Sequence, residues 1–161
     1  MRRTHLSGKK LSEIKPGAPE PTRMTCYDVF TGLEQFVRQY MDGIATVTLG
    51  EGSIDRAVSV SPEHLAYAIR VTVEHLSDGH ILHFVFSERD GEFCVSVMPA
   101  TTPDYRAIAE IAAAWRSAGF KVKSVGFSIV LYTPFLTDRD LLMRQLASDL
   151  FKRILENYFF L

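Results

Sequence analysis

The sequence predicts an α+β fold, in which a mixed, mostly antiparallel sheet is covered by helices in a two-layer α/β sandwich, with one extra helix at the C-terminal end. Three observations predict it. Segments with strand-like alternation of apolar residues come in pairs, and segments with helical apolar spacing separate these pairs. The length of 161 residues, with 47% hydrophobic and 23% charged residues, is typical of one globular domain.

The first 24 residues differ in composition from the rest of the chain. They hold six basic and two acidic residues and three of the seven prolines, whereas the remainder has an acidic excess. Without periodic apolar residues this segment cannot offset its ordering entropy by burial. We therefore expect a flexible basic arm over 1–24 and a single α+β domain over 25–161. The arm lacks interleaved aromatic residues and the body lacks a basic stripe, so nucleic acid is not an expected partner.

The elements of the first half follow from local signals. A capping box at Thr25–Asp28 opens a first helix, which ends at Asp42-Gly43. Residues 44–49 and 54–60 read as two short strands around a glycine-rich turn. Ser61-Pro62-Glu63 then starts a second helix because serine caps well and proline is tolerated in the first turn. Its apolar stripe consists of Leu65, Ile69, Thr72, Val73 and Leu76.

The second half continues the alternation. Residues 80–86 and 92–98 form a hairpin whose Asp90-Gly91 supplies the positive-φ positions of a tight turn. Residues 101–104 open a third helix that stops at Gly119, and Val122–Tyr132 returns as a strand that Pro134 ends. A second capping box at Thr137–Asp140 leads into a long C-terminal helix with a wide apolar face.

From Ile44 to Phe135 this order of elements resembles the ATP-binding domain of sensor histidine kinases, the GHKL or Bergerat fold. In that family a strand pair leads to a helix with two functional asparagines, then to a hairpin that ends in an Asp- and Gly-containing motif, then to a helix and a closing strand. The matching segments here are Ser61–Leu76, Ile81–Met98, Ala107–Gly119 and Phe127–Pro134.

The nucleotide-binding residues that the resemblance implies are replaced in this chain. The two helix asparagines fall at Val71 and His75, the adenine-reading aspartate falls near Pro99, and the glycines fall near Thr101 and Pro103. Proline has no side-chain acceptor and no free N–H. The family's ATP lid is missing, since Pro99–Tyr105 is too short to wrap a triphosphate. We call these five residues, Val71, His75, Pro99, Thr101 and Pro103, the vestigial positions. We expect that the chain binds neither ATP nor another cofactor.

No other catalytic or metal-binding set emerges from the spacing. His80 and His83, three apart in a strand, point to opposite faces, and no cysteine pair completes a zinc site. Cys26 and Cys94 are too few for a disulfide framework, and Cys94 alternates in an apolar strand, so both are expected to be reduced core thiols. His64 and His75 also lack the sequence setting of a phosphoacceptor histidine.

The C-terminal helix extends beyond the region of resemblance. Its apolar face is wider than docking on one sheet requires. Two interpretations remain open: it packs inside the chain, as a cover for the second face of the sheet, or it forms a dimer or partner surface. The candidate partner residues are Leu155, Tyr158, Phe159 and Phe160.

These observations favour a non-catalytic regulatory or adaptor module of signalling that binds a protein partner or itself. The alternatives are a phosphotransfer protein of a two-component relay, and a small-molecule binder or enzyme with a re-specialised pocket near His75, Pro99 and Thr101. Residues 25–41 offer one helix rather than the two of a phosphotransfer hairpin, which counts against the relay. No apolar run approaches a membrane span and no signal peptide opens the chain, so we expect a cytoplasmic location.

Overall fold

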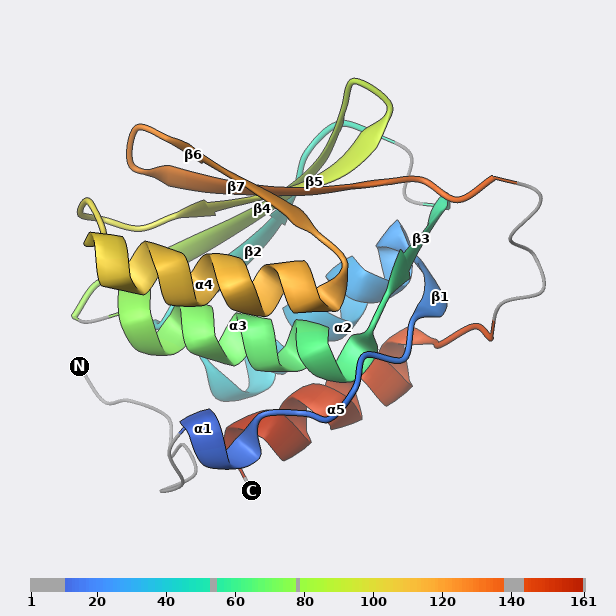
Figure 1. The fold of residues 1–161 in the computed structure, drawn as a ribbon, viewed down its shortest axis with the longest axis horizontal. Helices are drawn as coiled ribbons and strands as arrows, with labels where there is room; N and C mark the ends of the chain where they lie inside the picture. The colour runs from blue at the N-terminus through green and yellow to red at the C-terminus, as the bar shows by residue number, and fades with distance from the viewer. Residues whose placement is uncertain (1–10, 53–54, 78, 138–143, 161) are drawn as a thin grey trace.

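A computed structural model describes residues 11–52, 55–77, 79–137 and 144–160. A five-stranded sheet lies above a layer of helices, and a two-stranded sheet stands at one side (Figure 1). The elements in chain order are α1 (Leu11–Ile14), β1 (Thr22–Thr25), α2 (Cys26–Tyr40), β2 (Ala45–Leu49), β3 (Ala57–Val60), α3 (Pro62–Leu76), β4 (Leu82–Arg89), β5 (Glu92–Met98), α4 (Tyr105–Ala118), β6 (Lys121–Val125), β7 (Ser128–Pro134) and α5 (Ser148–Phe160).

The large sheet has the strand order β2-β4-β5-β7-β6. Only β2 and β4 are parallel, and the other neighbours are antiparallel, as the sequence predicts. Alternate residues such as Phe84, Val95 and Leu131 are buried in one hydrophobic core together with residues of α2, α3 and α4. These helices form the layer beneath the sheet (Figure 1). The predicted α+β sandwich is therefore confirmed, and its element order from β2 to β7 is the one that the histidine-kinase resemblance implies.

Helix α3 is the centre of the helix layer. Pro62 stands in its first turn, and the predicted stripe from Leu65 to Leu76 is buried. On α4, Trp115 Nε1 donates a hydrogen bond to Thr72 Oγ1 (2.8 Å). A buried polar group is costly unless it is paired, so this bond fixes how α3 and α4 face each other.

Two strand predictions need correction. Strands β2 and β3 do not pair with each other, because β2 joins β4 in the large sheet and β3 joins β1. The single strand expected over Val122–Tyr132 is a hairpin, in which Gly126, at a φ of +60°, turns the chain between β6 and β7. A residue with a positive φ interrupts a strand, and glycine adopts it without a steric penalty.

The boundary expected at residue 24 also changes. Strand β1 pairs antiparallel with β3, so that Thr22 faces Val60, and Met24 is fully buried in the core. Backbone pairing and burial place residues 22–24 in the domain rather than in a flexible arm. The described residues before them include α1, which lies beside α3 (Figure 1).

Helix α5 begins at Ser148, later than the capping box at Thr137–Asp140 predicts; residues 138–143 lie outside the described part of the chain. It packs against α2 and α3, on the side of the helix layer away from the sheet (Figure 1). It therefore adds a third layer and does not cover the second face of the sheet.

Candidate functional site

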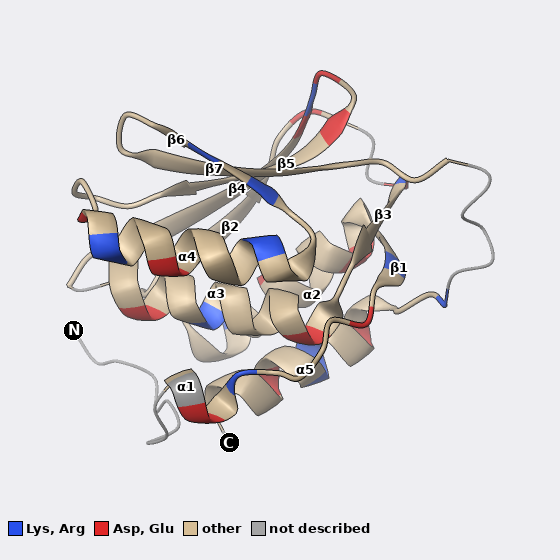
Figure 2. Cartoon of the chain, viewed as in Figure 1, with Lys and Arg blue, Asp and Glu red and all other residues tan. Residues whose placement is uncertain are grey.

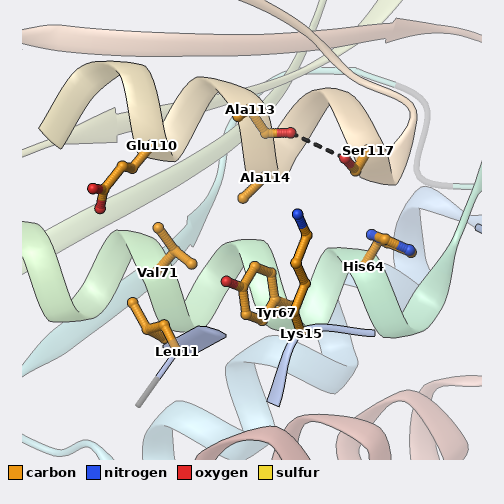
Figure 3. A pocket seen from close by; sticks show the side chains of 9 residues that line it. All are labelled: Leu11, Lys15, His64, Tyr67, Val71, Glu110, Ala113, Ala114 and Ser117. Carbon is orange, nitrogen blue, oxygen red and sulfur yellow. Dashed lines mark hydrogen bonds between the residues drawn. The ribbon is translucent and has the colours of Figure 1, made fainter. Parts of the chain in front are cut away.

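Two regions hold or border the five vestigial positions, whereas the predicted partner residues lie on α5. The first, called here the open end, is the end of the large sheet where β4 begins, β5 ends and β6 turns into β7, together with the start of α4 (left in Figure 1). The second, called here the α3–α4 groove, is the hollow between these two helices beside α1 (Figure 3).

Val71 and His75 stand one turn apart on α3. Val71 is buried and lines the α3–α4 groove. His75 Nε2 lies 2.5 Å from Glu110 Oε2 of α4, so its ring is already engaged across the two helices. Neither residue supplies the amide oxygen that the resemblance implies at its position, since valine is apolar and the imidazole faces a carboxylate.

Pro99, Thr101 and Pro103 lie together in the six residues between β5 and α4. The same connection ends at Asp104, whose carboxylate accepts a hydrogen bond from the Ala107 N–H (2.8 Å) and so caps α4. This bond engages one of the two carboxylate oxygens of Asp104 and fixes the start of α4. The described connection is thus a short capped turn, and none of the three residues lines the α3–α4 groove.

The open end exposes large apolar side chains. The residues and their exposed fractions are Tyr105 93%, Phe127 62%, Val125 52%, Ile81 44% and Met98 39%. Strand register brings them to one end of the molecule, because Met98 pairs with His83 near the start of β4 and Val125 pairs with Ser128 at the start of β7. A gathering of exposed apolar residues is typical of an interaction site, whereas single ones are ordinary.

The α3–α4 groove encloses about 380 Å³. Figure 3 shows its wall of small and apolar side chains, formed by Val71 of α3, Ala113 and Ala114 of α4, and Leu11 of α1. Its polar residues are Lys15, His64, Tyr67, Glu110 and Ser117. His64 Nε2 donates to the Gly17 carbonyl (2.7 Å), which fixes the segment after α1 against α3.

Among the described residues, the remaining histidines and both cysteines form no catalytic set. His83 Nδ1 is hydrogen-bonded to Thr46 on the neighbouring strand (2.6 Å), and the described residues contain no metal-binding group of histidine, cysteine, aspartate and glutamate. Cys26 and Cys94 are buried free thiols, as predicted. Burial raises the pKa of Cys26 to about 12 and also raises the pKa of Cys94, so both are poor nucleophiles at neutral pH.

Only part of the predicted C-terminal partner surface is accessible. Leu155 and Phe159 are fully buried, so for these two the prediction of a partner surface is wrong: each packs in the core that α5 shares with α2 and α3. Tyr158 and Phe160 are half-buried; the Tyr158 ring stands 6.5 Å from that of Tyr67, and burial raises the Tyr158 pKa to about 12. The structure uses much of this face to hold α5 in place.

One residue that anchors α5 was not singled out from the sequence. Arg70 of α3 is buried; its Nη1 donates to the Tyr158 carbonyl (2.7 Å) and its Nη2 to Glu74 Oε1 (3.0 Å). Arginine is seldom fully buried without partners, and a charged residue inside an apolar stripe was the signal that could have identified it. By contrast, Lys15 and Tyr67 of the groove come from segments whose proximity no local pattern indicates.

Charges are interspersed over the described surface. Lys and Arg alternate with Asp and Glu along α3, α4 and α5 (Figure 2). No helix among the described residues is long and apolar enough to cross a membrane.

Searches against family models and curated proteins find no match. Among solved structures the chain is similar to the histidine kinase AdeS of Acinetobacter baumannii, with 8% identity over 79% of this chain and 74% of that one and a TM-score of 0.49. It is also similar to the catalytic domain of the histidine kinase ThkA, with 14% identity over 71% and 99% of the two chains and a TM-score of 0.44. Full-length ShkA, solved with AMPPNP, gives 12% identity over 79% of this chain and 34% of that one, with a TM-score of 0.43. With TM-scores below 0.5, these similarities carry no argument about activity, ligand or partner.

Proposed function

We propose that the chain is a non-catalytic, cytoplasmic regulatory or adaptor module of signalling, and that its open end binds a protein, either another partner or a second copy. The observation that carries the proposal is the composition of this end. Where the resemblance implies nucleotide-binding residues, the chain has a short capped turn with exposed apolar side chains around it.

The chemistry of the five vestigial positions argues against nucleotide binding. Magnesium requires oxygen ligands, and the adenine amino group requires an acceptor. The Val71 side chain has no polar atom, the Pro99 and Pro103 side chains have no acceptor, and the His75 ring faces Glu110. With these groups absent or engaged, Mg²⁺-ATP would lose both its metal ligands and its adenine contact.

The open end suits a protein partner instead. Tyr105 and Phe127 are aromatic, and aromatic anchors contribute much of the binding energy of interfaces through their large buried area. Regular elements place the backbone of both: Tyr105 is the first residue of α4, and Phe127 lies in the hairpin turn between β6 and β7. Rigid placement limits the entropy that binding must overcome.

The phosphotransfer alternative has weaker support. A phosphoacceptor histidine must reach solvent and its kinase, yet His64 is buried and bonded to Gly17, and His75 is bonded to Glu110. Within residues 25–41 the structure has the single helix α2. We therefore retain protein binding as the leading proposal.

Site-specific photocrosslinking in cells tests the proposal, because it traps a bound protein of any identity. A benzophenone amino acid replaces Tyr105 or Phe127, and in matched controls it replaces Tyr27 of α2 or Leu150 of α5, which are also exposed. We expect discrete protein adducts from positions 105 and 127, and none from 27 and 150. Equal labelling at all four positions, or none at any, would contradict binding through the open end.

A further inference from the structure

The α3–α4 groove has the size and lining of a small-ligand site. Its volume of about 380 Å³ falls within the range of such sites, roughly 300–1,000 Å³. The hollow exists because α4 presents alanines, Ala113 and Ala114, opposite the Tyr67 ring of α3 (Figure 3). Most small-ligand sites combine such an apolar wall with a few convergent polar groups.

Three polar side chains of the groove already have partners. His64 donates to the Gly17 carbonyl, and the Ser117 hydroxyl donates to the Ala113 carbonyl (3.2 Å). Glu110 is paired with His75, and in Figure 3 its carboxylate points away from Lys15. One oxygen of the Glu110 carboxylate, Oε1, remains as an acceptor at the α4 side of the groove.

Two donors remain. Within the described part of the chain, neither the Lys15 ammonium nor the Tyr67 hydroxyl has a hydrogen-bond or ion-pair partner. Lys15 reaches alongside Tyr67 with its amino end toward α4 (Figure 3). Burial raises the Tyr67 pKa, so the hydroxyl keeps its proton at neutral pH and can donate it. The free donors of the groove thus comprise one cation and one hydroxyl, and the free acceptor is the second carboxylate oxygen of Glu110, which points away from Lys15 (Figure 3).

We propose that the α3–α4 groove binds a small amphiphilic anion, with its apolar body against Val71, Ala113 and Ala114 and its carboxylate or phosphate head on Lys15 and the Tyr67 hydroxyl. Lys15 belongs to the segment that His64 holds through Gly17, so the ligand would bridge this segment to α3 and α4. This inference is independent of protein binding at the open end, since no exposed apolar residue of that end lines the groove.

An NMR titration of the full chain tests the proposal with three probes that share an alkyl tail. Octanoate and octyl phosphate carry the two anionic heads, and 1-octanol is the neutral control. We expect saturable shifts of the Tyr67, Ala113 and Ala114 amides with at least one anion. Affinity for 1-octanol should be about fivefold weaker, the ratio that an ion pair with an exposed lysine such as Lys15 supplies. The stronger of the two anions identifies the head group.

Three variants sharpen the test. Lys15→Ala should weaken anion binding about fivefold and leave 1-octanol unchanged, whereas Lys121→Ala on the exposed edge strand β6 should change neither. Ala113→Phe, at an exposed position of α4, should fill the groove and abolish the shifts without disturbing the core. Equal binding of all probes to wild type and Lys15→Ala, or shifts confined to Tyr105 and Phe127, would overturn the proposal.

Discussion

The two ends of the large sheet use their apolar residues in opposite ways. At the end where β7 leaves the sheet, called here the closed end, Phe135 bridges to Val58 of β3, and the Arg56 guanidinium lies 4.0 Å from the centre of the Phe135 ring. Strand β1 completes this end through Met24. At the open end, Tyr105 and Phe127 extend into solvent.

The difference indicates which end is available for function. Backbone groups of the closed end are bonded within the chain: the Leu136 N–H donates to the Ala57 carbonyl (2.8 Å) and the Leu146 N–H to the Arg23 carbonyl (3.0 Å). Apolar surface that is buried inside the chain stabilises the fold, and apolar surface left exposed can stabilise a complex. Changes at the closed end should therefore reduce stability, and changes at the open end should reduce binding.

The largest effect is expected from deletion of residues 1–24. This removes most of β1 and the Met24 side chain, and it leaves β3 without its partner strand. We expect the free energy of unfolding to fall by about 5 kcal/mol or more, which is enough to abolish the cooperative unfolding transition of a domain of this size. Circular dichroism during thermal unfolding measures it, and a melting temperature within about 2 °C of the full chain would show that β1 contributes little.

A methionine at each end gives a matched comparison. Met24→Ala should lower the free energy of unfolding by about 2–5 kcal/mol, because the residue is fully buried and its truncation leaves a cavity. Met98→Ala, the same change at a partly exposed position, should cost less than about 1 kcal/mol. Urea unfolding of the two variants measures both losses of stability. Equal losses would contradict the proposal that apolar residues stabilise the fold at the closed end but not at the open end.

Gly119 tests the backbone at the closed end. It ends α4 at a φ of +112°, and a Cβ there would lie 3.1 Å from the Ser59 carbonyl oxygen. Gly119→Ala should therefore destabilise the chain by about 1–2 kcal/mol. The control is Gly17→Ala, where a Cβ would meet nothing within 4 Å. Urea unfolding should show that this control changes the free energy of unfolding by no more than about 0.5 kcal/mol.

The smallest effect on stability is expected from the open end itself. Tyr105→Ser and Phe127→Ser should each change the free energy of unfolding by no more than about 0.5 kcal/mol, since both side chains are mainly exposed. Tyr105→Ser, introduced into the chain that carries the crosslinker at position 127, should nevertheless reduce the protein adducts. Phe127→Ser should do the same in the chain that carries the crosslinker at position 105. A variant that unfolds the chain would show that its side chain belongs to the core.

Local signals in the sequence predicted the elements better than their packing. Ser61-Pro62-Glu63 correctly marks the start of α3, and Asp90-Gly91, with φ values of 51° and 76°, forms the predicted hairpin turn. The pairing of β1 with β3 joins residues 38 positions apart, as in Thr22 and Val60, and no local pattern encodes it. The wide apolar face of the C-terminal helix likewise left open whether it packs within the chain or binds a partner, and it did not indicate that α2 and α3 bury Leu155 and Phe159.

The candidate site shows the same division. The sequence placed Val71 and His75 on one helix and the three remaining vestigial positions in one turn, because spacing within an element is local information. The His75–Glu110 pair and the approach of Lys15 to Tyr67 depend on how separate segments pack. Exposure of Tyr105 and Phe127 could not be foreseen either, since an apolar residue at the end of an element is equally compatible with a core position.

The central proposal is that this α+β domain does not bind nucleotide at the five vestigial positions. Isothermal titration calorimetry of the full chain with Mg²⁺-ATP tests it most directly, with the heat of dilution as the control. We expect no saturable heat at millimolar nucleotide. The side chains of Val71, His75 and Pro99 offer neither an oxygen ligand for magnesium nor an acceptor for the adenine amino group. A saturable isotherm with a micromolar dissociation constant, equivalent to about −8 kcal/mol, would contradict the account.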